Sequence, residues 1–123
     1  MKFNPRLKAD IASYLDYTII VEGKKDVNSL NALGFKKVYA IHQNSVPIRE
    51  RILELSKIID KKEKICILTD FDKKGKTLYM LIKQEMQALG MRLDSSLRGL
   101  IIKAQVSHIE GLSSFIEKLE KVN

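Results

Sequence analysis

Short apolar runs alternate along this chain with longer segments in which apolar residues recur every three or four positions. The runs at 17–21, 37–41, 65–69 and 99–104 are mostly apolar and have the length of buried strands. Strands separated by helices pair in parallel, because each helix carries the chain back to the same end of the sheet. The sequence therefore predicts an α/β fold with a four-stranded, mainly parallel sheet and helices on both faces.

Glycine and proline mark several ends of the predicted helices. Gly34 and Gly90 each follow a helical segment, where the missing Cβ permits the left-handed backbone that ends a helix. Pro47 stands at a favourable first helical position. The predicted helices cover 5–15, 26–33, 48–59, 77–89 and a closing segment from Leu112, with a polar connection over 91–98.

Length and composition indicate one compact unit. The 123 residues are 45% hydrophobic and contain neither a repeat nor a linker, so we expect a single domain over 1–123, with a leading helical segment (1–16) and a core (17–123). Cys66 is the only cysteine, which excludes an internal disulfide and favours a buried thiol. The N-terminus lacks the apolar core of a signal peptide, and no apolar stretch reaches the roughly 20 residues of a membrane span. We therefore expect a cytoplasmic protein without membrane contact.

Acidic residues follow the first and third predicted strands. Glu22 comes directly after the first strand, and Asp70 and Asp72 come directly after the third. Parallel strands end along one edge of the sheet, where ligands of open α/β sheets bind, so these carboxylates are expected to meet there. Such oxygen ligands suit Mg²⁺ or Mn²⁺ and hence phosphate chemistry. The alternative is that the aspartates are solvated turn residues, or that Asp72 caps the helix that begins near Lys74.

Lysines flank both acidic motifs in a chain with an excess of positive charge. Lys and Arg number 22 against 15 Asp and Glu, a formal charge of +7, which favours a polyanionic partner such as RNA or DNA. Lys24, Lys25, Lys73 and Lys74 are expected beside the carboxylates, where they would contact phosphates. The alternative for each of them is an ordinary solvated surface lysine.

Several other residues are expected near the same edge in supporting roles. Gly23 either lets the backbone approach a ligand or makes a tight turn. Asn44 and Ser45 offer hydrogen bonds to a phosphate or cap the next helix. Asp26 either caps or orients the helix after the first motif, or supports Lys24 and Lys25. The remaining candidates are Gly75, a phosphate-site glycine, and Glu110, an additional carboxylate. His108 is expected to be structural or solvent-facing.

The two acidic motifs together resemble the Toprim domain. Glu-Gly-x-x-Asp after the first strand and Asp-x-Asp-x-x-Gly after the third, in four βα units from about Tyr17 onward, carry the resemblance. Toprim domains occur in topoisomerases, bacterial primases, OLD-type nucleases and the maturases of 5S ribosomal RNA, and have a Rossmann-like fold. The resemblance implies that Glu22 is a general acid/base or a carboxylate associated with the metal. It also implies that Asp70 and Asp72 coordinate the metal.

The resemblance implies two alternative hypotheses about function. One is a Mg²⁺-dependent phosphodiester-cleaving enzyme, a small nuclease acting in RNA processing or DNA repair. The other is a non-catalytic module that binds metal and nucleic acid within a larger complex. In either case we expect a partner or a homo-oligomer, because a domain of this size has little surface for selecting a substrate. The chain departs from many relatives at 42–45, where they carry a small residue or glycine.

Overall fold

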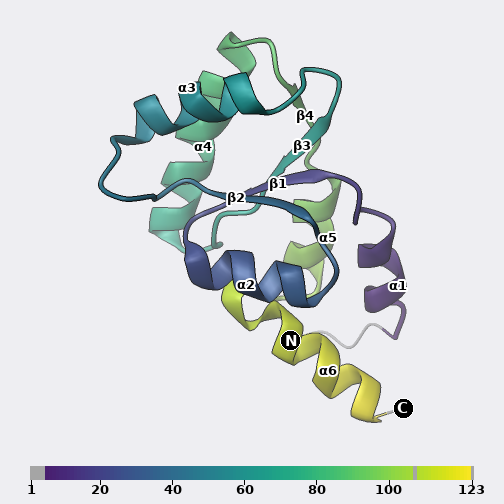
Figure 1. Ribbon diagram of the computed structural model, residues 1–123. Helices are drawn as coiled ribbons and strands as arrows, with labels where there is room; N and C mark the ends of the chain where they lie inside the picture. Colours follow the sequence, from purple (N-terminus) through teal and green to yellow (C-terminus); the bar gives the residue numbers. More distant parts are fainter. Residues whose placement is uncertain (1–4, 107, 123) are drawn as a thin grey trace.

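A single four-stranded sheet forms the centre of the molecule (Figure 1). The computed structural model describes residues 5–106 and 108–122, so the first four residues of the expected leading segment lie outside the described residues. The sheet has the order β2-β1-β3-β4 and every pairing is parallel. Its strands are β1 (Thr18–Val21), β2 (Lys37–Ala40), β3 (Lys64–Ile67) and β4 (Arg92–Leu93). The predicted α/β fold with a mainly parallel four-stranded sheet is confirmed.

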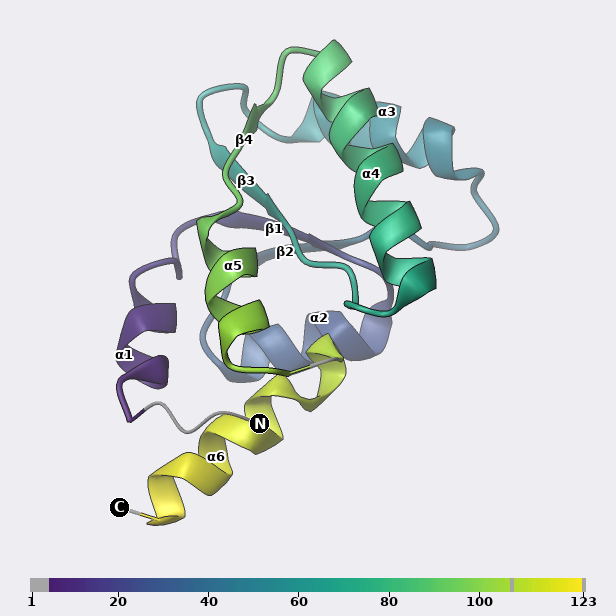
Figure 2. The same cartoon turned by 180° about the vertical axis from the view of Figure 1, so that it is seen from behind.

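Helices cover both faces of this sheet, as predicted (Figures 1 and 2). On one face lie α1 (Leu7–Ala12), α2 (Lys24–Ala32), α5 (Ser96–Lys103) and α6 (Leu112–Val122), the last preceded by the 3-10 turn η1 (Ile109–Gly111). On the other face lie α3 (Ile48–Ile58) and α4 (Lys73–Ala88). Within the described residues, no helix is both long and apolar enough to cross a bilayer.

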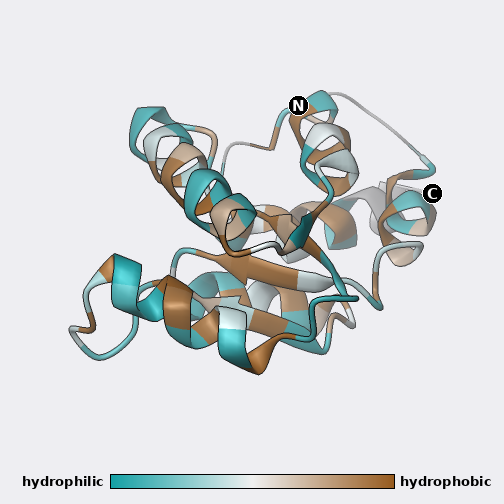
Figure 3. Ribbon diagram, turned by 90° about the horizontal axis from the view of Figure 1, so that it is seen from above, coloured by the Kyte–Doolittle hydropathy of each residue, from teal (hydrophilic) through white to brown (hydrophobic). Residues whose placement is uncertain are grey.

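The alternation of side chains along each strand divides the apolar residues between two cores. Ile19 and Val21 of β1 pack into the core beneath α1, α2, α5 and α6, while Ile20 between them packs beneath α3 and α4. In Figure 3 the strands are mainly brown, and the helices carry teal residues on their outer sides. Cys66 is fully buried, and this burial raises the pKa of its thiol to about 12, so it acts as a small apolar residue.

The prediction of a fourth strand at 99–104 is wrong. Residues 99–103 belong to α5, and Ala104 is its C-cap. The fourth strand is Arg92–Leu93, which lies in the segment predicted to be a polar connection and pairs with Lys64 and Ile65. The reason is that α5 buries only one side: Leu97 and Ile101 are fully buried, whereas Ile102 is 51% exposed. A short apolar run does not distinguish a strand from one turn of a buried helix.

Candidate metal centre

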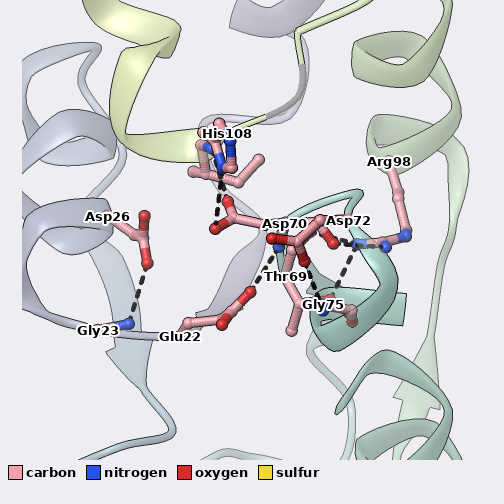
Figure 4. A network of polar contacts seen from close by, with 10 residues as sticks. Glu22, Gly23, Asp26, Thr69, Asp70, Asp72, Gly75, Arg98 and His108 are labelled. Atoms are coloured by element: carbon pink, nitrogen blue, oxygen red, sulfur yellow. Dashed lines mark hydrogen bonds and ion pairs between the residues drawn. The ribbon is translucent and has the colours of Figure 1, made fainter. Parts of the chain in front are cut away.

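The β1 and β3 ends lie side by side at the carboxyl edge of the sheet. Ile20 pairs with Ile67, and the backbone N–H of Leu68 continues the ladder by donating to the carbonyl of Ile20. Glu22 and Asp70 follow these paired ends, and the Oε2 atom of Glu22 accepts a hydrogen bond from the backbone N–H of Asp70 at 2.8 Å (Figure 4). The Glu22 carboxylate thus joins the two acidic loops directly.

Asp70 is held from a third part of the chain as well. Its Oδ1 accepts a hydrogen bond from the backbone N–H of Ile109 at 2.9 Å, and its Oδ2 lies 3.4 Å from Nδ1 of His108 (Figure 4). Both partners belong to the segment that leads into η1 and α6. The C-terminal part of the chain therefore contributes directly to the surroundings of this carboxylate.

Asp72 is the N-cap of α4. Its Oδ1 accepts a hydrogen bond from the backbone N–H of Gly75 at 2.8 Å, which satisfies one of the free donors of the first helical turn. Asp72 therefore caps the helix, as one of the two alternatives predicted, and it does so with one of its two carboxylate oxygens. Capping and metal coordination are compatible, because a carboxylate has two oxygens and this hydrogen bond uses one of them.

Asp70, Asp72 and His108 form a group with the composition of a metal site. One ligand atom from each lies within 4.8 Å of the others. Carboxylates suit Mg²⁺ and Mn²⁺, and an imidazole adds a nitrogen ligand that transition metals accept. The His108 side chain is 55% exposed, as expected for a loop residue, yet its ring is turned toward Asp70. Glu22 is not one of the three residues, but it is joined to the group by its hydrogen bond with the backbone N–H of Asp70.

Gly75 occupies a position that admits no side chain. A Cβ built on it would lie 2.0 Å from the backbone carbonyl oxygen of Asp70. The same turn is closed by Thr69, whose Oγ1 donates a hydrogen bond to the carbonyl of Gly75 at 2.7 Å. The glycine of the second motif thus allows the first turn of α4 to fold back against the end of β3, which sets the positions of Asp70 and Asp72.

The pKa of Asp26 is affected by the negative charges at this edge of the sheet. It is buried at the start of α2 and accepts a hydrogen bond from the backbone N–H of Gly23 at 3.0 Å. Burial is the main cause that raises the pKa of Asp26, and the charges of Asp70, Glu22 and Glu110 raise it further against the effect of that hydrogen bond. A cation bound between the carboxylates would offset this repulsion, so the residues present fit a divalent metal.

The other predicted residues lie in exposed turns and loops. Lys24 and Lys25 are exposed in the first turn of α2, and Lys73 and Lys74 are exposed in the first turn of α4. Asn44 and Ser45 lie in the exposed loop between β2 and α3, both with positive φ. Glu110 is not a member of the Asp70–Asp72–His108 group.

Arg98 is a residue near the site that the sequence did not indicate. Its side chain is only 6% exposed, and Nη1 donates to the backbone carbonyl of Thr69 at 2.7 Å and reaches that of Ile67 at 3.4 Å. The guanidinium lies over the rings of Phe71 and Tyr79, at 4.6 and 4.2 Å from their centroids. Burial lowers the pKa of Arg98. Arg98 therefore anchors the end of β3 immediately before Asp70.

Replacing Arg98 by Met is expected to lower the free energy of unfolding by about 2–4 kcal/mol, because two buried carbonyls lose their donor and the ring contacts are lost. Urea unfolding measures this change. The matched control is Arg49→Met: Arg49 pairs with Glu85 on the exposed surface, so a change within about 1 kcal/mol is expected. Equal effects of the two substitutions would contradict an anchoring role for Arg98.

Comparison with known proteins agrees with this geometry. The Toprim domain model matches residues 18–109, which include both acidic motifs and His108. A UPF0292 protein of Methanocaldococcus jannaschii is 34% identical over 104 residues, covering 81% of this chain and 78% of that protein. A UPF0292 protein of Methanosarcina barkeri is 32% identical over 106 residues, covering 82% of this chain and 70% of that protein.

A solved structure shares the fold. A protein from Aquifex aeolicus superimposes with a TM-score of 0.73 at 21% identity, covering 89% of this chain and 98% of that one. At this identity the likeness concerns the fold alone. The family match, together with the placement of Glu22, Asp70 and Asp72 at the carboxyl ends of β1 and β3, identifies the chain as a member of the Toprim domain family.

Proposed function

We propose that this protein is a Mg²⁺- or Mn²⁺-dependent enzyme that cleaves phosphodiester bonds in nucleic acid. The observation that carries the proposal is the Asp70–Asp72–His108 group, beside which Glu22 is hydrogen-bonded to the backbone of Asp70. Toprim domains typically bind divalent metal ions, and membership of the family favours a nucleic-acid partner. The formal charge of +7 supports that partner, because cationic side chains attract a polyanion.

Asp70 and Asp72 would hold the metal, with His108 as the third ligand. When bound, such a cation would polarise a phosphate oxygen and offset its negative charge. Asp70 is well suited to this role because the N–H of Ile109 fixes one carboxylate oxygen and so limits the rotation of the other. Arg98 supports the same position by anchoring the end of β3.

Glu22 and the flanking lysines would act on the nucleic acid itself. In hydrolysis the oxygen of a water molecule forms a new P–O bond to the phosphorus and loses a proton to solvent, while the P–O bond to the leaving oxygen breaks. The leaving oxygen must gain a proton, which a carboxyl group at the position of Glu22 would deliver. The exposed lysines in the first turns of α2 and α4 would hold the strand through its phosphates. They are Lys24, Lys25, Lys73 and Lys74.

One observation favours the second candidate, a non-catalytic module that binds metal and nucleic acid. The Oε2 atom of Glu22 is occupied by the N–H of Asp70, so this carboxylate also serves to join the two loops. A residue with only that structural role would not transfer a proton. The two candidates share the metal site and differ in whether Glu22 takes part in a reaction.

The metal site is tested by the melting temperature. Mg²⁺ or Mn²⁺ should raise the melting temperature of the parent protein by mass action, with a stabilisation of about 2.7 kcal/mol at a hundredfold excess over Kd. In the double variant Asp70→Asn with Asp72→Asn, the metal-dependent rise should disappear. Asparagine keeps an oxygen acceptor for the N–H groups of Ile109 and Gly75, so the variant is expected to fold.

Asp60→Asn is the matched control for this experiment. Asp60 lies in the turn before β3, at the opposite end of the strand, where it accepts a hydrogen bond from the backbone N–H of Lys62. This variant should respond to metal as the parent does. A double variant that still responds to metal like the parent would show that the carboxylates of Asp70 and Asp72 do not form the site.

A further inference from the structure

An apolar groove of about 570 Å³ lies beside the proposed metal centre, between the beginnings of α3 and α4. Its less exposed lining residues are Ile48, Leu78 and Leu81. Its exposed lining residues are His42, Lys73, Lys74 and Thr77. The groove therefore combines an apolar surface with one aromatic ring and two positive charges. A ligand that matches it needs a flat apolar part and a nearby negative charge.

The groove is connected to the proposed metal centre through the first turn of α4. Lys73 follows Asp72 directly, and both belong to the turn at which α4 begins. In Figures 1 and 2 this turn lies at the same edge of the sheet as the beginning of α2. A polymer with a phosphate at the carboxylates would therefore pass the first turn of α4 and place its neighbouring unit over the groove.

We infer that the groove receives an unpaired nucleobase next to the phosphate held at the metal centre, so that the substrate is single-stranded or has a frayed end. The inference rests on the proposed function and specifies its substrate class. A base offers the flat apolar part, and the phosphates on either side of it match Lys73 and Lys74. His42 supplies a ring for stacking. A base within a duplex is already stacked and paired, so it cannot enter.

Binding of labelled DNA tests this inference. The probes are a fluorescein-labelled single strand of roughly 10 nucleotides and the blunt duplex of the same sequence, with Ca²⁺ replacing Mg²⁺ to slow cleavage. The double variant His42→Ala with Leu81→Gln should bind the single strand on the order of 10-fold more weakly, the effect of removing one stacking platform. Its affinity for the duplex should change little.

Met80→Gln is the matched control. Met80 is the neighbour of Leu81 on α4 and is 48% exposed, but it does not line the groove. This variant should bind both probes as the parent does. The inference would be overturned if the groove variant bound the single strand and the duplex equally more weakly. It would also be overturned if neither probe bound more weakly, and the groove would then be assigned to a protein partner.

The metal-dependent rise in melting temperature separates this inference from the proposed function. The groove variant should keep that rise, because the carboxylates are unchanged. A parent protein that responds to metal and binds both probes, with a groove variant that binds them equally well, would overturn the groove alone. A parent protein that neither responds to metal nor binds either probe would overturn the proposed function and with it the groove.

Discussion

Glu22→Gln is expected to lower the rate of nucleic-acid cleavage by about 10²-fold or more, the usual contribution of a general acid/base. Glutamine keeps an oxygen that accepts the N–H of Asp70, so the junction between the two acidic loops should survive. The substitution removes the ability to exchange a proton together with the negative charge of the carboxylate. Single-turnover cleavage with Mg²⁺ measures the loss, and the metal-dependent rise in melting temperature, measured in parallel, should be retained.

The matched control for this substitution is Glu63→Gln. Glu63 lies just before β3, at the opposite end of the sheet, where it pairs with Lys37. Its replacement should leave cleavage unchanged. Cleavage that survives in Glu22→Gln would contradict proton transfer by Glu22 and leave the metal ligands as the source of catalysis. If the parent protein cleaves none of the RNA and DNA tested, the binding module becomes the better description.

Gly75→Ala is expected to destabilise the fold by about 3 kcal/mol or more, the upper end of the range for overpacking. The added Cβ would lie 2.0 Å from the carbonyl oxygen of Asp70, and a backbone atom cannot turn aside as a flexible side chain can. The end of β3 and the start of α4 must therefore move apart. Because Asp70 is one partner of this contact and Asp72 accepts a hydrogen bond from the N–H of Gly75, the metal response should weaken together with stability.

Gly99→Ala is the same chemical change, but it is expected to raise the free energy of unfolding. Gly99 lies within α5, and a Cβ built there meets nothing within 4 Å. Alanine should stabilise the helix by about 0.5–1 kcal/mol, because glycine loses more backbone entropy on folding. Urea unfolding of both variants measures the contrast. Similar midpoints for the two would show that the space around Gly75 is not restrictive.

The part of the fold that is predictable from sequence is the part with a local signal. β1 and β3 are continuous apolar runs bounded by turn residues, and the acidic motifs follow them at once, so the sequence alone predicts their common edge. The fourth strand has no such signal, because β4 has two residues and its pairing with Lys64 and Ile65 depends on tertiary contacts. The apolar run within α5 resembles a strand more closely than β4 does.

The residues of the site that sequence reasoning passed over are those placed by distant parts of the chain. His108 reaches Asp70 only because the segment around η1 returns to the sheet edge. Arg98 resembles a surface arginine in sequence, and its burial against Phe71 and Tyr79 depends on how α5 packs. The one local signal for His108 is its place in a loop beside Glu110, which is too common a feature to single it out.

The attachment of α6 has a thermodynamic consequence for ligand binding. Ser29 on α2 donates to the carbonyl of Ile109 and contacts Ser113, so α2 holds the same segment whose N–H and imidazole reach Asp70. A cation coordinated by His108 would bind more tightly to the state in which this segment is docked, because Asp70 and Asp72 alone offer one ligand fewer. By linkage, metal would tighten the docking of the C-terminal helix, and a partner that displaced the helix would weaken metal binding. The affinity of the site for metal would thus depend on whether α6 is docked against α2.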